Sequence, residues 1–136
     1  MLDNFELNVL RELQAGIHED NVKAGWWTDL KSGVDLANEA RLGTRFGKAL
    51  VAEKLALIHS EVSEGLEGAR KGLPDDKLPH RPMLEVELAD ACIRILDLAG
   101  ALGLDLAGAM QEKLIFNITR PDHKIENRVK ENGKAF

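Results

Sequence analysis

The chain has 136 residues, of which 44% are hydrophobic and 30% are charged, and its formal net charge is −5. This length and balance are typical of a single globular domain that buries a core without disulfides or a structural metal. The negative charge argues against binding to a nucleic-acid polymer, which needs a positive surface, and the single cysteine, Cys92, excludes an internal disulfide and a two-cysteine metal motif.

The sequence also offers no segment that suits a membrane. The longest stretch without Asp, Glu, Lys or Arg runs from Leu98 to Leu104, far short of the roughly 20 apolar residues of a membrane span. The N-terminal residues 1–14 mix acids with apolar residues and have no basic leader, so they do not resemble a signal peptide. We therefore expect a cytoplasmic protein with no membrane contact.

Apolar residues recur at helical spacing along the first half of the chain. This periodicity predicts a first helix that ends near Lys23. Residues 25–43 are irregular, with room for one short helix. A long second helix is expected from about Thr44 to Lys71, and the proline-rich segment 72–82 is the clear loop.

Two further helices are expected in the second half, over about 83–100 and 106–120. The first of these is apolar over most of its circumference, so we infer that a second copy of the chain covers one of its faces. The other should point its apolar residues inward, namely Leu106, Met110, Leu114 and Ile118. We predict an all-α, four-helix-bundle-type domain over residues 1–136, with 121–136 as a polar tail, assembled as a homodimer or homotetramer.

Two pairs of acidic residues lie on the second and third helices. Glu61 and Glu64 are three residues apart, and Glu87 and Asp90 repeat that spacing across the loop. Residues at i and i+3 share a helix face, so antiparallel pairing of the helices would bring the four carboxylates together. They would repel one another unless a cation lay between them, and oxygen ligands favour a hard ion. We predict a Mg²⁺ site, with Mn²⁺ as a substitute; the alternative is a solvated acidic face.

A di-iron site is disfavoured by the histidines. Such a site needs a histidine three residues after a glutamate on two helices. None of the four histidines has that spacing, so the ligand type does not fit.

A second set of polar residues lies on the fourth helix. Lys113, Asn117 and Arg120 fall on one face, where two cations and an amide could grip a phosphate; the alternative is a solvated polar face. Lys54 lies seven residues before Glu61 on the same helix face, so it could reach a phosphate or pair with groups around Glu61.

Three other side chains bear on such a site. Trp26 and Trp27 are candidates for stacking on a nucleobase, with burial as core residues as the alternative and one tryptophan for each role as a third reading. Arg94 follows Asp90 by one helical turn and is expected to be an internal ion-pair partner rather than a substrate ligand.

The acid pairs, followed by Lys113, Asn117 and Arg120, resemble the motif of the MazG-like all-α nucleoside triphosphate pyrophosphohydrolases, especially small stand-alone members of phage type. The resemblance covers about residues 50–124. It implies that a (deoxy)nucleoside triphosphate is hydrolysed to the monophosphate and pyrophosphate, as part of nucleotide metabolism. It further implies that the four acids hold Mg²⁺, that the Lys, Asn and Arg contact the phosphates, and that the protein is a dimer or a dimer of dimers.

The expected chemistry needs one carboxylate to orient or deprotonate the attacking water. We assign this role to Glu64, with Glu61 and Glu67 as alternatives. Two other functions stay open: a phosphoribosyl-ATP pyrophosphohydrolase that uses the same metal cluster, and a non-catalytic helical module that binds metal or nucleotide.

Overall fold

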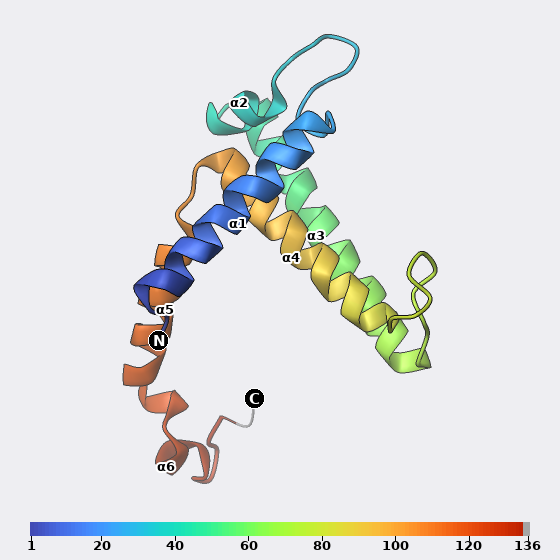
Figure 1. The fold of residues 1–136 in the computed structure, drawn as a ribbon. Coiled ribbons are helices and arrows are strands. Elements are labelled where there is room, and N and C mark those ends of the chain that lie inside the picture. The colour runs from blue at the N-terminus through green and yellow to red at the C-terminus, as the bar shows by residue number, and fades with distance from the viewer. Residues whose placement is uncertain (135–136) are drawn as a thin grey trace. The chain divides into compact units, whose positions relative to one another are not determined.

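A computed structural model describes residues 1–134 (Figure 1). The helices are α1 (Asn4–Lys23), α2 (Leu36–Arg41), α3 (Arg45–Lys71), α4 (Met83–Leu102), α5 (Leu106–Thr119) and α6 (Ile125–Arg128), with the 3₁₀ turn η1 (Pro121–His123) before α6. Within the described residues β-pairing is limited to isolated bridges, one of which joins Thr28 and Asp35. The prediction of an all-α fold is confirmed.

Across residues 1–134 we find no helix with the length and apolar character needed to traverse a bilayer.

Capping residues explain the predicted ends of the long helix α3. The side chain of Thr44 accepts a hydrogen bond from the backbone N–H of Gly47 at 3.0 Å, which satisfies one of the free donors of the first turn. Gly72 ends the helix in the left-handed region, with φ of 64°. Helix α4 runs past its predicted end at Gly100, because Gly103, with φ of 67°, supplies its left-handed cap.

The chain divides into two compact units. The larger unit is Leu13–Leu104, and the smaller one combines Met1–Glu12 with the chain from Asp105 onward. Helix α1 contributes residues to both. The tail predicted at 121–136 belongs to the smaller unit, and its described part contains η1 and α6.

Polar contacts tie the N-terminus of the smaller unit to α5. The guanidinium of Arg11 donates two hydrogen bonds to Asp105, at 3.0 and 2.9 Å. The backbone N–H of Leu2 donates to Gln111 at 3.0 Å, and the Gln111 amide donates back to the Leu2 carbonyl at 2.9 Å. The apolar residues Met110, Leu114 and Ile118, expected to point inward, are exposed in the single chain.

Helices α3 and α4 form the main pair of the larger unit, where they lie side by side and antiparallel (Figure 1). Two glycines of α3 permit their close approach. A Cβ added at Gly65 would lie 3.4 Å from the Cβ of Glu87, and one added at Gly68 would lie 2.9 Å from the Cβ of Met83. The helices therefore pack closely along this stretch, which includes Glu87.

The core of the larger unit lies around Trp27, which packs with five other buried apolar residues: Ala37, Ala40, Leu50, Leu98 and Ala101. A buried carboxylate joins this core to α1. One oxygen of Asp97 accepts hydrogen bonds from the indole N–H of Trp27 and from Nδ1 of His18, both at 2.8 Å. The two donors satisfy the buried charge and orient both rings.

The contact of α1 with α4 depends on the absence of a side chain at Gly100. A Cβ at this position would lie 2.6 Å from the Cβ of His18. We expect Gly100→Ala to lower the free energy of unfolding by about 1–3 kcal/mol through overpacking, as measured by denaturant unfolding.

Gly16 provides the matched control for that substitution. It is also helical, but nothing lies within 4 Å of an added Cβ. Gly16→Ala should therefore raise the free energy of unfolding by up to about 1 kcal/mol, through helix propensity. Equal effects of the two substitutions would show that α1 does not pack against α4 at this point.

Candidate functional site

Three carboxylates from α3 and α4 converge in the larger unit. Glu61, Glu87 and Asp90 each offer an oxygen, and these atoms all lie within 4.8 Å of one another. Glu61 and Glu87 are each only 7% exposed, and Asp90 is half-buried. The i, i+3 spacing predicted this meeting across the helix pair for three of the four acids.

Glu64, the fourth acid of the predicted set, lies outside this trio. Its side chain is exposed, but it is close enough for its charge to act on Glu87. Glu67, an alternative for the water-orienting role, is engaged by two cations of its own helix, Arg70 at 3.4 Å and Lys71 at 2.5 Å.

Arg94 is the cation in contact with the trio. Its Nε donates a hydrogen bond to Oε1 of Glu61 at 2.6 Å. The prediction that Arg94 is an ion-pair partner is therefore confirmed, but the acid that it binds lies on α3 rather than on its own helix. One guanidinium leaves the local charge negative when all three carboxylates are ionised.

The proximity of like charges acts most strongly on Glu87. Burial raises the pKa of this carboxyl from 4.5 to about 7, with further contributions from the hydrogen bond that its protonated form makes to Glu61 and from the charges of Glu64, Glu61 and Asp90. The cluster thus disfavours its own full ionisation, which is the situation that a bound cation reverses.

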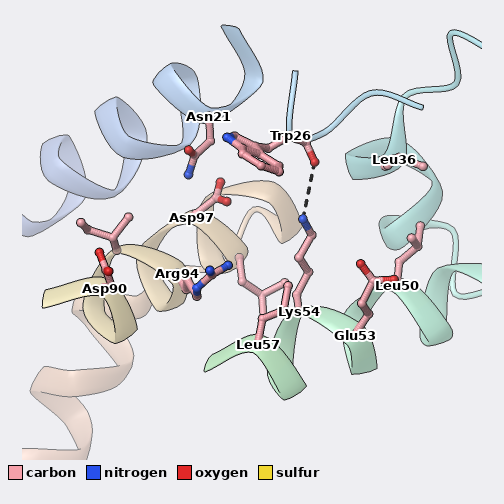
Figure 2. Close-up of a pocket in the computed structure, with 12 residues that line it drawn as sticks. Asn21, Trp26, Leu36, Leu50, Glu53, Lys54, Leu57, Asp90, Arg94 and Asp97 are labelled. Carbon is pink, nitrogen blue, oxygen red and sulfur yellow. Dashed lines mark hydrogen bonds between the residues drawn. The ribbon is translucent and has the colours of Figure 1, made fainter. Parts of the chain in front are cut away.

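A pocket of about 500 Å³ adjoins the trio at Asp90 and lies within the larger unit (Figure 2). Its lining includes the cations Lys54 and Arg94 and the polar side chains of Asn21 and Asp97. The ammonium of Lys54 lies 4.5 Å from the centre of the Trp27 ring and donates a hydrogen bond to the Trp26 carbonyl at 3.5 Å (dashed line in Figure 2). Lys54 therefore stands at the pocket, beside the tryptophans rather than beside Glu61.

The two tryptophans have separate environments. Trp27 is 2% exposed and belongs to the core, whereas Trp26 is 67% exposed and lines the pocket. This arrangement matches the third alternative, in which one tryptophan is a core residue and the other is available for stacking at the pocket. Trp26 keeps the candidate role in base stacking, and burial leaves Trp27 without a face open to a base.

The predicted phosphate ligands of α5 belong to the smaller unit. Lys113 lies 4.8 Å from the centre of the Phe116 ring. Arg120 donates two hydrogen bonds to Asp122, at 2.9 and 2.7 Å. The carboxamide oxygen of Asn117 is buried and has no hydrogen-bond partner among the described residues. Lys113 and Asn117 line one pocket of α5 together with apolar residues such as Met110, and Arg120 is not among its lining residues. The phosphate-binding role of the three side chains stays a prediction.

Three polar residues of the pocket were not proposed as site residues from the sequence: Asn21, Glu53 and Asp97. Asp97 lies two helical turns after Asp90, and this spacing places it on the same side of α4. Glu53 directly precedes Lys54 on α3. Asn21 lies on α1, far from the acids in sequence, and only the packing of α1 brings it to the pocket.

No protein-family model, curated protein or solved structure matches the chain. The resemblance to MazG-like enzymes therefore rests on the motif residues themselves and stays a prediction.

The raised pKa of Glu87 predicts how the stability of the metal-free protein depends on pH. The carboxyl has a pKa of 4.5 when unperturbed and about 7 in the folded chain, so the folded state binds the proton more tightly than the unfolded state. The free energy of unfolding should fall as pH rises from about 4.5 through about 7. Denaturant unfolding at several pH values, in the presence of a chelator, measures this dependence.

Glu87→Gln should flatten this pH dependence, because the variant has no proton to lose at this position. The matched control is Glu85→Gln, which removes an exposed acid of the same helix whose partner is Arg81. If wild type and Glu87→Gln show the same slope, the pKa of Glu87 is not raised.

Proposed function

We propose that the chain is a Mg²⁺-dependent nucleoside triphosphate pyrophosphohydrolase of the MazG-like type, built as a four-helix-bundle-type fold. One observation carries the proposal: the carboxylates of Glu61, Glu87 and Asp90 converge within 4.8 Å, beside a pocket lined by two cations. A metal cluster next to cations suits a polyphosphate. The motif spacing of the acids supports the same family.

The donor set fits a hard divalent cation. All three groups are carboxylates, and two unit charges 4 Å apart repel by about 4 kcal/mol at an effective dielectric constant near 20. Oxygen donors alone favour Mg²⁺, with Mn²⁺ as a substitute, over softer metals. When bound, Mg²⁺ would polarise the phosphate and neutralise charge on the leaving group.

The residues of the pocket would then have distinct tasks. Lys54 would hold the anionic chain of the substrate, and the exposed face of Trp26 is the platform for a base. The size of the pocket, about 500 Å³, is within the range of small-molecule sites. This part of the proposal does not depend on Lys113, Asn117 or Arg120.

The reaction needs a base for the attacking water, and we keep Glu64 in that role. It is exposed, one turn from Glu61, and outside the trio, so its carboxylate is the one least committed to a metal. The water oxygen forms a bond to the α-phosphorus as the bond to the α–β bridging oxygen breaks. Pyrophosphate leaves with that electron pair, and the water proton passes to Glu64 and then to solvent.

The proposed assembly is a homodimer or homotetramer. Large apolar side chains are exposed along the paired helices of the single chain, namely Leu55, Val62 and Leu66 on α3 and Leu84, Leu88 and Ile95 on α4. A second copy of the chain would bury such residues, as contiguous exposed apolar surface is typical of interaction sites.

Hydrolytic activity gives the direct test of function. With Mg²⁺ and a panel of the common nucleoside triphosphates, we expect release of pyrophosphate, detected with a coupled assay. Asp90→Asn and Glu64→Gln should each lower kcat by about 100-fold or more, because each removes a group that acts on the developing charge or on the water.

Glu85→Gln is the control, since Glu85 lies on α4, is exposed and paired with Arg81, and is not one of the trio. It should retain wild-type activity. Nucleotide binding without release of pyrophosphate would instead identify a non-catalytic binding module, and activity confined to phosphoribosyl-ATP would identify the alternative enzyme.

Sedimentation velocity tests the assembly. At about micromolar concentration we expect no stable monomer, because a stable interface would bury the exposed apolar residues of α3 and α4. Leu66→Lys should shift the protein toward the monomer, since it places a charge on that surface. A wild-type protein that sediments as a well-folded monomer would contradict the proposed assembly.

A further inference from the structure

We propose that Arg94 is an exchangeable counter-cation of the acidic trio: it neutralises Glu61 in the metal-free protein, and it transfers to a phosphate in the adjoining pocket when a divalent cation binds the acids. This inference rests on the proposed function, because it assigns a role to Arg94 within the same site.

The first observation is that the two side chains of the Arg94–Glu61 ion pair differ in their exposure to solvent. The side chain of Glu61 is 9% exposed, and that of Arg94 is 43% exposed. Glu61 also belongs to the trio, so a metal ion and the guanidinium would compete for one carboxylate. The buried acid is held in place, whereas the arginine borders open space and can move.

The second observation is the direction in which Arg94 can move. Arg94 lines the same pocket as Asp90 and Lys54, and Figure 2 shows the three side chains around one space. Lys54, beside Trp26 and Trp27, is the other cation that lines the pocket. The planar fork of an arginine matches phosphate oxygens in a bidentate manner, which a lysine cannot do. A phosphate is therefore a natural second partner for Arg94.

The charges of the pocket favour such an exchange. Glu53, Asp90 and Asp97 line it together with the two cations, so an anionic ligand would be repelled while Arg94 remains on Glu61. A divalent cation on the trio would replace the guanidinium as the partner of Glu61. The freed guanidinium would then face the ligand. Linkage requires that Arg94 oppose Mg²⁺ binding and favour phosphate binding to the metal-loaded protein.

Titration calorimetry with Mg²⁺ alone tests the first half of the exchange. Arg94→Ala should bind Mg²⁺ at least about five-fold more tightly than wild type, as expected for a coupling of about 1 kcal/mol. Arg81→Ala is the matched control, because its pair with Glu85 at 2.8 Å is exposed on both sides and includes no acid of the trio. It should leave the affinity within about two-fold of wild type.

Inorganic pyrophosphate, added to the Mg²⁺-saturated protein, tests the second half. Arg94→Ala should bind it about ten-fold more weakly than wild type, as expected when a charge-assisted hydrogen bond is lost. Arg94→Lys, which keeps the charge but not the fork, should bind Mg²⁺ as wild type does and pyrophosphate with intermediate affinity. It also serves as the test if Arg94→Ala does not fold.

The outcomes separate this inference from the proposed function. Unchanged or weaker Mg²⁺ binding by Arg94→Ala overturns the exchange, as does pyrophosphate binding that is insensitive to Arg94. In either case, Mg²⁺ binding and pyrophosphate release by the wild type would leave the proposed enzyme standing. A wild type that binds no Mg²⁺ overturns both.

Discussion

The close contact of α3 with α4 is the constraint on which the site depends. The absence of a side chain at Gly68 avoids a clash with Met83, and Gly65 lies against Glu87, one of the acids that meet between the two helices. Because the acids lie between packed helices, Glu87 is buried and repelled by its neighbours, and both effects raise its pKa. A folded chain that keeps such a cluster accepts a loss of stability in the metal-free state, and a cation that binds the cluster recovers it.

Two buried carboxylates of α4 have opposite kinds of neighbours: one is bound by hydrogen-bond donors, and the other lies among acids. Asp97 accepts hydrogen bonds from His18 and Trp27, so its charge is satisfied by neutral or cationic donors within the core. Glu87 instead faces three other acids. Asp97 therefore acts as a structural residue that links α1 to the core, whereas Glu87 belongs to a group of oxygens suited to an added cation. The contrast explains why one acid is a poor candidate ligand and the other a good one.

Local rules predicted the long helix α3 and the meeting of acids from both helices from the sequence alone. Thr44 and Gly72 mark the ends of α3 through capping, and the i, i+3 spacing of the acids, with a short loop between the helices, predicts that acids of both helices meet. The remainder depends on packing. Trp26 and Trp27 are identical neighbours, and only the path of the turn after Gly25 decides which is buried. Arg94 has acids one turn away in both directions on its own helix, yet the crossing of α3 and α4 gives it Glu61 as a partner.

The charge of the chain bears on the order in which ligands would enter. With a net charge of −5, the protein attracts a divalent cation over a Debye length of about 8 Å at physiological salt, and it repels a free triphosphate over the same distance. The pocket adds to this repulsion, since Arg94 is paired with Glu61. Under the proposed exchange, metal binding therefore both lowers the negative charge of the site and releases an arginine toward the phosphate. Under the proposed function, a triphosphate that arrives with its own metal ion would satisfy both requirements in one step, so the proposal favours the metal–nucleotide complex over the free nucleotide as the substrate.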